Sequence, residues 1–143
     1  MTHDDIHPAY GYDGDIRPQT AWRWSEEKSA LIIDVRTDAE REWVGWVPGA
    51  VAVAWKQWPG MAVNANFAVQ VQAACSKAGV QKAALLCRSG VRSIAAALEV
   101  AAHPELKIEV FNILEGFEGD CDESAHRSVL GGWKRAGLPW RQN

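Results

Sequence analysis

The chain has 143 residues, of which 48% are apolar and 23% are charged, with 12 glycines, 6 prolines and a formal net charge of −3. Its length predicts one domain that buries roughly 68% of the surface of the unfolded chain, so a core can form without disulfides or metal ions. The composition excludes a disordered chain, a collagen-like repeat and a disulfide-stapled miniprotein, and the negative charge argues against general nucleic-acid binding, which needs a basic stripe.

The first part of the chain predicts an arm, a helix and a strand. Residues 1–15 are rich in Asp, His, Tyr and Gly without periodicity, and we expect an extended or loosely ordered arm ahead of a domain over residues 16–143. The Asp and His residues of this arm lack the helical spacing of metal ligands, so no metal site is expected there. A helix can begin at Arg17, because Pro18 suits a first turn. The apolar run 31–35 is typical of a strand buried on both faces.

The middle of the chain alternates between helices and strands. We expect, in chain order, a helix over residues 39–44, a strand over 51–55, a loop over 56–65 and a helix over 67–77. Thr37 or Asp38 can cap the first of these helices, and Gly45 ends it. Gly79 ends the second helix, whose apolar residues recur at helical spacing.

The last part of the chain continues this alternation. We expect a strand over residues 83–87, a helix over 90–102, a strand over 108–111 and a short helix over 123–130. Strands that alternate with helices at this spacing form right-handed crossover units. The predicted fold class is therefore α/β, with a mostly parallel sheet that has helices on both faces.

A strand, a short loop and a helix meet at the sequence Cys87-Arg88-Ser89-Gly90-Val91-Arg92-Ser93. Ligands of open α/β sheets bind at such a junction. The free amides at the helix start and the charges of Arg88 and Arg92 favour a thiolate, so we expect a lowered pKa for Cys87. Gly90 allows the loop amides to curl around one point and form an anion-binding nest. A nucleophilic sulfur among these donors suits attack on an anionic substrate and stabilisation of the charged intermediate.

The length of this loop separates two chemistries. Cysteine phosphatases place an Arg six positions after the nucleophile, in a cradle wide enough for a tetrahedral phosphoryl group. Here Arg92 follows Cys87 by five positions, and the sixth position is Ser93. The tighter cradle favours a persulfide sulfur over a phosphoryl group.

Three blocks of the sequence resemble the signatures of the rhodanese-like sulfurtransferase family, in the family's order and over about residues 15–141. They are Ile33-Asp34-Val35-Arg36 with Glu42-Trp43, Gly45 and Val47-Pro48-Gly49-Ala50; the active-site loop Cys87 to Arg92 with Ser93; and Asn112-Ile113-Leu114-Glu115-Gly116-Phe117 with Gly132-Trp133 and Ala136-Gly137-Leu138-Pro139. One departure is Trp46, which stands where the family usually has His. This change concerns the local packing and leaves the catalytic loop untouched.

The resemblance implies a central, mostly parallel five-stranded sheet flanked by helices on both faces, and a two-step transfer of sulfur without a cofactor. The Cys87 thiolate would attack the outer sulfur of a small anionic donor such as thiosulfate, release sulfite and become a persulfide, which cyanide or a thiol would discharge. The donor and the persulfide would be bound by Arg88, Ser89, Gly90, Val91, Arg92 and Ser93. Asp34 and Arg36 would support the site by an ion pair that braces the end of the sheet.

Two other functions remain open at this point. The same loop would serve a persulfide relay or binding module that carries sulfur to an acceptor protein, and less readily a small cysteine phosphatase. An apolar rim of Trp55, Trp58 and Phe67 at the mouth of the site would favour a docking partner. The simpler interpretation of the many Trp residues is packing in the core.

The three cysteines indicate a reducing compartment rather than a disulfide framework. We expect Cys75 to be a small core residue and Cys121 to be semi-buried, the alternative for Cys121 being a resolving thiol that accepts sulfur from Cys87. No apolar run approaches the roughly 20 residues that span a bilayer. No secretory signal is visible among the polar first residues, so we expect a cytoplasmic protein that binds neither membranes nor nucleic acid.

Overall fold

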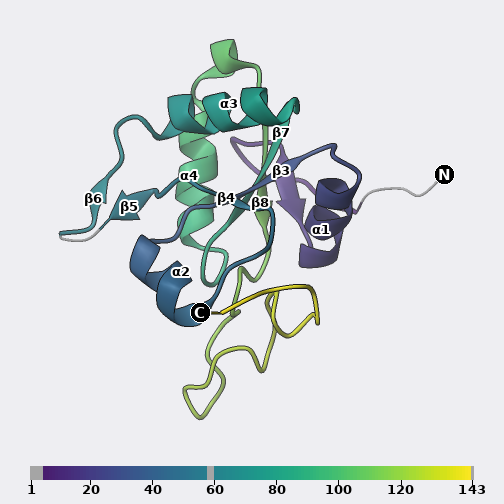
Figure 1. Cartoon of the computed structure of the whole chain (residues 1–143), viewed down its shortest axis with the longest axis vertical. Helices are drawn as coiled ribbons and strands as arrows, with labels where there is room; N and C mark the ends of the chain where they lie inside the picture. The colour runs from purple at the N-terminus through teal and green to yellow at the C-terminus, as the bar shows by residue number, and fades with distance from the viewer. Residues whose placement is uncertain (1–4, 58–59, 143) are drawn as a thin grey trace.

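A six-stranded sheet forms the centre of the protein, shown in Figure 1 as a computed structural model that describes residues 5–57 and 60–142. The strand order is β1-β2-β8-β7-β3-β4. The strands are β1 (Ile6–His7), β2 (Gly14–Ile16), β3 (Leu31–Asp34), β4 (Val51–Ala52), β7 (Lys82–Leu86) and β8 (Glu109–Ile113). Five of them run parallel, and β1 pairs antiparallel with β2 at one edge. The predicted mostly parallel α/β sheet is confirmed, with β1 as an additional edge strand.

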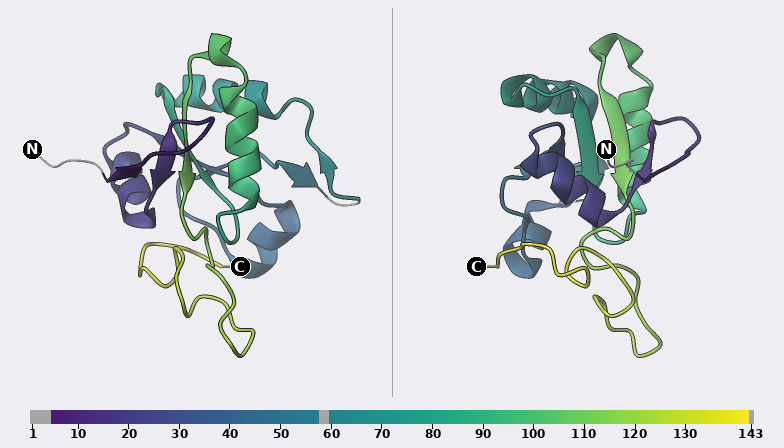
Figure 2. Two further views of the ribbon diagram at one scale, coloured as in Figure 1. Left: turned by 180° about the vertical axis from the view of Figure 1, so that it is seen from behind. Right: turned by 90° about the vertical axis from the view of Figure 1, so that its right-hand side faces the viewer.

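Four α-helices flank this sheet: α1 (Pro18–Glu26), α2 (Asp38–Val44), α3 (Phe67–Ala78) and α4 (Arg92–Ala101). A short 3₁₀ helix (Pro104–Leu106) follows α4. Alternate residues of β7 enter two different core clusters, because successive side chains of a strand point to opposite faces. The cluster on one face contains the apolar sides of α3 and α4, and the cluster on the other contains α1 and the C-terminal segment. Figure 2 shows that this C-terminal segment lies at the same end of the sheet as α2.

The N-terminal segment is part of the sheet. Asp15 of β2 lies opposite Asn112 of β8, and Ile16 is fully buried in the core. Sequence periodicity did not reveal these strands because β1 and β2 have only two and three residues. The boundary between an arm and a domain at residue 15 stays a prediction.

Two other segments differ from the sequence-based expectation. Residues of the expected loop form a small antiparallel hairpin of β5 (Lys56–Gln57) and β6 (Ala62–Val63). The helix expected over 123–130 is wrong. The carboxylate of Asp122 accepts hydrogen bonds from the backbone N–H groups of Ser124 and His126, and these local bonds compete with helical ones.

Aromatic and sulfur side chains are distributed between core and surface. Trp55 is only 9% exposed and packs edge-to-face on the buried Phe67, so an apolar rim formed by these two residues is wrong. Trp58, the third member of that expected rim, lies outside the described residues. Cys75 is buried as predicted, and this burial raises its pKa to about 11. Cys121 is exposed rather than semi-buried.

Within residues 5–57 and 60–142, no helix combines the length and the apolar character needed to span a membrane.

Candidate active site

Cys87 lies directly after β7, at the carboxyl end of the sheet, and the loop that it begins leads into α4. The residue is buried, with 1% of its surface exposed. Its Sγ accepts a hydrogen bond from the Gly90 backbone N–H at 3.1 Å and lies 3.2 Å from Ser93 Oγ. A strand, a tight loop and the first turn of a helix therefore surround one sulfur atom. Such a junction is where open α/β sheets bind ligands.

Two glycines allow the loop to take this shape. Gly90 has φ +94°, so α4 begins at Arg92 and not at residue 90 as expected. Gly116 has φ +62° and lies so close to the loop that a Cβ there would be 2.6 Å from the carbonyl oxygen of Cys87. The neighbouring Phe117 N–H donates to that same oxygen at 2.8 Å. The segment after β8 therefore supports the loop through its backbone.

Arg92 is held by a carboxylate from another helix. Its Nη1 and Nη2 donate to Glu40 Oε1 and Oε2 at 2.7 and 2.6 Å, and both side chains are partly buried. Glu40 is also the third residue of α2, where it completes a capping box with Thr37. Burial alone would raise the pKa of Glu40, but the hydrogen bonds and charge of Arg92, with the bonds from Thr37, outweigh burial and lower this pKa.

Arg88 also has an acidic partner. Its Nε donates to Glu118 Oε2 at 3.0 Å, and its side chain is more exposed than that of Arg92. Each guanidinium has five N–H donors, so one carboxylate leaves donors for a further anion. The two carboxylates nevertheless offset the positive charge that the sequence places at the loop.

Of the remaining predicted loop residues, Gly90 and Ser93 are buried, Ser89 is half-buried and Val91 points outward with 68% of its surface exposed. The structure therefore brings Gly90 and Ser93 to the sulfur. Val91 forms an exposed apolar tip beside it.

Asp34 and Arg36 form a buried ion pair at the end of β3. Arg36 Nε and Nη2 donate to the two oxygens of Asp34 at 2.9 and 2.6 Å, and Nη2 also donates to the Gly45 carbonyl at 2.7 Å. The guanidinium stacks on Phe117, 4.4 Å from the ring centroid. The pair thus connects β3, the end of α2 and the segment that supports the loop.

Three residues that contact the loop or the start of α4 were not identified as site residues from the sequence: Glu40, Glu118 and Asn112, whose Oδ1 accepts a hydrogen bond from the Ser93 hydroxyl. Asn112 carried a signal, because it is a polar residue inside an apolar strand and buried polar groups need partners. Glu40 and Glu118 approach the loop only through the tertiary fold, so no local spacing in the sequence predicts their pairing with Arg92 and Arg88.

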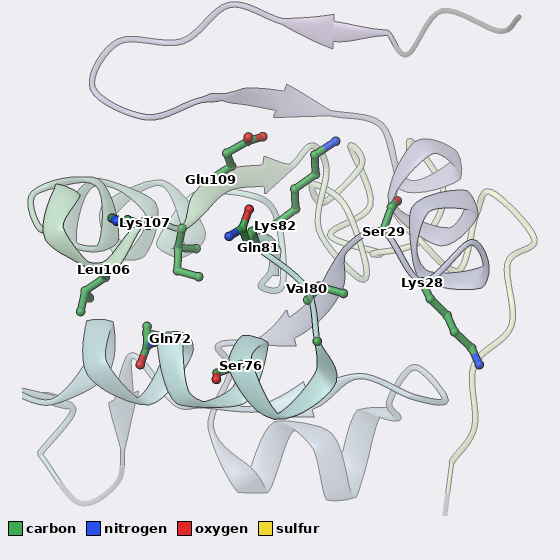
Figure 3. Close-up of a pocket in the computed structure, with 12 residues that line it drawn as sticks. Lys28, Ser29, Gln72, Ser76, Val80, Gln81, Lys82, Leu106, Lys107 and Glu109 are labelled. Carbon is green, nitrogen blue, oxygen red and sulfur yellow. The ribbon is translucent and has the colours of Figure 1, made fainter.

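A cavity of about 700 Å³ lies at the other end of the sheet, among residues at the start of β7 and β8. Its lysines, Lys28, Lys82 and Lys107, point in different directions (Figure 3). The Lys82 ammonium lies over the Trp24 ring, 4.7 Å from its centroid. Because these charges do not converge, the cavity is a weaker candidate than the loop at Cys87.

The family model of the rhodanese-like domain matches residues 17–123, more than half of the chain. The chain therefore belongs to the rhodanese-like family. Among solved structures, Rv0390 from M. tuberculosis is 37% identical, with a TM-score of 0.75, and the match covers 92% of this chain and 99% of that one.

Two more distant structures share the fold. Thiosulfate sulfurtransferase from Pseudomonas aeruginosa is 23% identical, with a TM-score of 0.55, and the match covers 95% of this chain and 21% of that one. The As-Sb reductase from Leishmania major is 12% identical, also with a TM-score of 0.55, over 79% of this chain and 90% of that one. No curated protein matches the chain.

Proposed function

We propose that the protein is a sulfurtransferase that takes a sulfane sulfur from a small anionic donor, such as thiosulfate, onto Cys87 and passes it to cyanide or a thiol. One observation carries this proposal. The chain is a rhodanese-like domain in which Arg92 follows Cys87 by five positions, and the Gly90 backbone N–H of the loop between them donates a hydrogen bond to Cys87 Sγ. Backbone donors at a nucleophile stabilise the charged sulfur that forms on it.

The reaction transfers one sulfur atom between nucleophiles and needs no external oxidant. The Cys87 thiolate attacks the outer sulfur of thiosulfate, the bond between the two donor sulfurs breaks, and sulfite leaves with that electron pair. The product is a Cys87 persulfide. An acceptor nucleophile then attacks the outer persulfide sulfur, and the S–S bond breaks to return the Cys87 thiolate.

Arg88 and Arg92 bind the anionic donor in this proposal. The Glu118 carboxylate accepts from only part of the Arg88 guanidinium, and the Glu40 carboxylate from only part of that of Arg92. The remaining N–H groups can donate to the sulfonate oxygens of the donor. Because both arginines already carry a carboxylate, the donor gains less from charge than the sequence alone predicts.

A second candidate is a persulfide relay that carries sulfur to or from a partner protein. The exposed Val91 at the loop tip favours it, since an apolar side chain near a reactive sulfur suits contact with a protein surface. A phosphatase is disfavoured by the short spacing from Cys87 to Arg92.

Mass spectrometry of the intact protein after incubation with thiosulfate tests the first candidate. We expect the mass of one sulfur atom to be added, removed by a reductant, and discharged by cyanide as thiocyanate. Cys87→Ser abolishes the addition, whereas Cys75→Ser and Cys121→Ser retain it as matched controls.

Each other outcome contradicts the thiosulfate activity in a distinct way. No addition to folded protein, followed by loading from a cysteine desulfurase, identifies the relay. Turnover of a phosphate ester without sulfur loading identifies the phosphatase.

A further inference from the structure

A cavity of about 460 Å³ lies between α2 and the edge strand β4, apart from the loop that holds Cys87. Its volume falls in the range of ligand cavities, roughly 300–1,000 Å³. The lining combines apolar and charged side chains: Trp46, Val47, Ala50 and Ala52 are apolar, and Asp34, Asp38, Arg41 and Glu42 are charged. Trp46 is half-buried, so part of its indole is accessible from this cavity.

The charges that line this cavity do not cancel. Asp34 is neutralised by Arg36, whose guanidinium donates to both of its carboxylate oxygens. Asp38 pairs with Arg41 one turn further along α2. Glu42 is exposed and has no ion-pair partner among the contacts of residues 5–57 and 60–142. The cavity therefore keeps one uncompensated negative charge.

A planar cation complements this lining. An indole attracts a cation that lies over its ring, and a guanidinium can stack on an aromatic ring while it pairs with a carboxylate. A lysine ammonium has no flat face and is more strongly hydrated. Trp46 and Glu42 line the same cavity and can supply both interactions to one guanidinium.

We infer that this cavity binds an arginine side chain of a partner protein. The occupant is a polypeptide because β4 ends the sheet, and the 38% exposed Val51 on that strand offers an adjoining contact. Asp38 and Glu42 lie one turn apart on the side of α2 that lines the cavity, whereas Glu40 reaches Arg92 from the other side. The partner therefore contacts the helix that also borders the catalytic loop. The inference goes beyond the proposed function and does not depend on it.

Heteronuclear NMR of the isotopically labelled full chain tests the inference, with N-acetylarginine amide as the probe. N-acetylcitrulline amide is the matched control, because it has nearly the same shape and no charge. We expect millimolar arginine amide to cause saturable shifts of the backbone amide signals of Trp46, Ala50 and Ala52. The dissociation constant of the citrulline amide should be about threefold to tenfold higher, as expected for an exposed ion pair and a cation–π contact together.

Glu42→Gln removes the uncompensated charge and should weaken binding of the arginine amide about threefold, with little effect on the citrulline amide. Glu123→Gln is the matched control, because it removes the same charge from an exposed position outside the cavity. Its affinity for the arginine amide should equal that of the parent.

Trp46→Leu keeps an apolar side chain but removes the ring, and should also weaken binding of the arginine amide about threefold. Trp43→Leu is its control, since Trp43 is an exposed indole of the same helix that does not line the cavity. Thermal unfolding shows whether Trp46→Leu folds, and Glu42→Gln decides the question if it does not.

Equal affinities for the arginine and citrulline amides, or equal effects of Glu42→Gln and Glu123→Gln, overturn the inference. Saturable shifts confined to another part of the protein, or no saturable shift, overturn it as well. The measurement uses no sulfur donor, so a protein that fails to accept sulfur from thiosulfate still reports on this cavity.

Discussion

Glu40 holds the two guanidinium nitrogens of Arg92 that an anionic donor would also use. Glu40→Gln keeps an oxygen for the bonds from Thr37 but removes the competing charge. We expect kcat/KM for thiosulfate, a dianion, to rise about threefold to tenfold, because a partly exposed charge pair is screened and contributes modestly. Steady-state kinetics with thiosulfate and with the monoanion methanethiosulfonate measure this effect, and the gain should be smaller for the monoanion.

Glu42→Gln is the control for that experiment, since it removes one charge from an exposed position of the same helix. Equal gains from the two variants, or equal gains with the two donors, would show that Glu40 does not compete for Arg92.

The same ion pair makes stability depend on pH in acid. Since the pKa of Glu40 is lowered in the folded protein, its pair with Arg92 stabilises the fold above the ordinary Glu pKa and is lost as pH falls through the lower folded value. We expect the difference in unfolding free energy between the parent and Glu40→Gln to shrink between about pH 5 and pH 3. Denaturant unfolding at a series of pH values measures it, and a constant difference across that window contradicts the expectation.

At the scale of elements, the segment after β8 and the active-site loop are in direct backbone contact. Gly116→Ala combines a left-handed φ with a Cβ that would meet Cys87 and Arg88 backbone atoms at 2.6 Å. We expect a loss of stability well above the roughly 1 kcal/mol of φ strain alone, together with loss of sulfur loading. Thermal unfolding and intact-mass loading report the two effects.

Gly79→Ala separates strain from collision, because Gly79 has a similar φ of +74° and nothing within 4 Å of an added Cβ. Gly79→Ala should unfold at a slightly lower temperature than the parent and should add sulfur at Cys87 to the same extent. A Gly116→Ala protein that behaves like Gly79→Ala would show that the loop does not need this close approach.

An element could be predicted from the sequence when the interactions that form it are between residues close in the chain, or when they leave a local pattern of apolar residues. The strands around residues 31–34, 82–86 and 109–113 are apolar runs buried on both faces, and the sequence pattern identifies them. The helix expected over 123–130 failed because one carboxylate, that of Asp122, satisfies two backbone donors in a turn. β2 could not be found, because its stability comes from pairing with β8, almost a hundred residues later.

The same distinction applies to the site. Cys87 and its loop are contiguous, so their chemistry can be read from seven residues. Glu40 and Glu118 reach the loop arginines from remote segments, and no local sequence pattern connects them to the loop. The expectation of two free arginines therefore changed once the fold supplied their carboxylate partners.

At the scale of the whole molecule, the C-terminal segment is part of the core. Trp133 is fully buried, contacts Trp22 edge-to-face and donates from its indole N–H to the Pro139 carbonyl at 2.8 Å. It lies beyond residue 123, where the family match ends. We expect Trp133→Ala to lower the free energy of unfolding by about 3–5 kcal/mol. Denaturant unfolding measures this loss.

Trp43→Ala is the control for that substitution, since Trp43 is an exposed indole on α2. It should change stability by roughly 0.5 kcal/mol or less. A similarly small effect at Trp133 would mean that the C-terminal segment packs on the domain without stabilising it.

The C-terminal segment also sets an order of assembly. The backbone N–H of Trp133 donates to the Gly116 carbonyl. Trp46 and Arg141 each donate a backbone N–H to the carbonyl of the other. A chain is synthesised from its N-terminus, so Trp133 and Arg141 leave the ribosome after every strand of the sheet. The nucleophile and its arginines therefore emerge well before the segment that braces their loop. During translation Cys87 is therefore exposed first without the segment that braces its loop, and residues synthesised later complete that support.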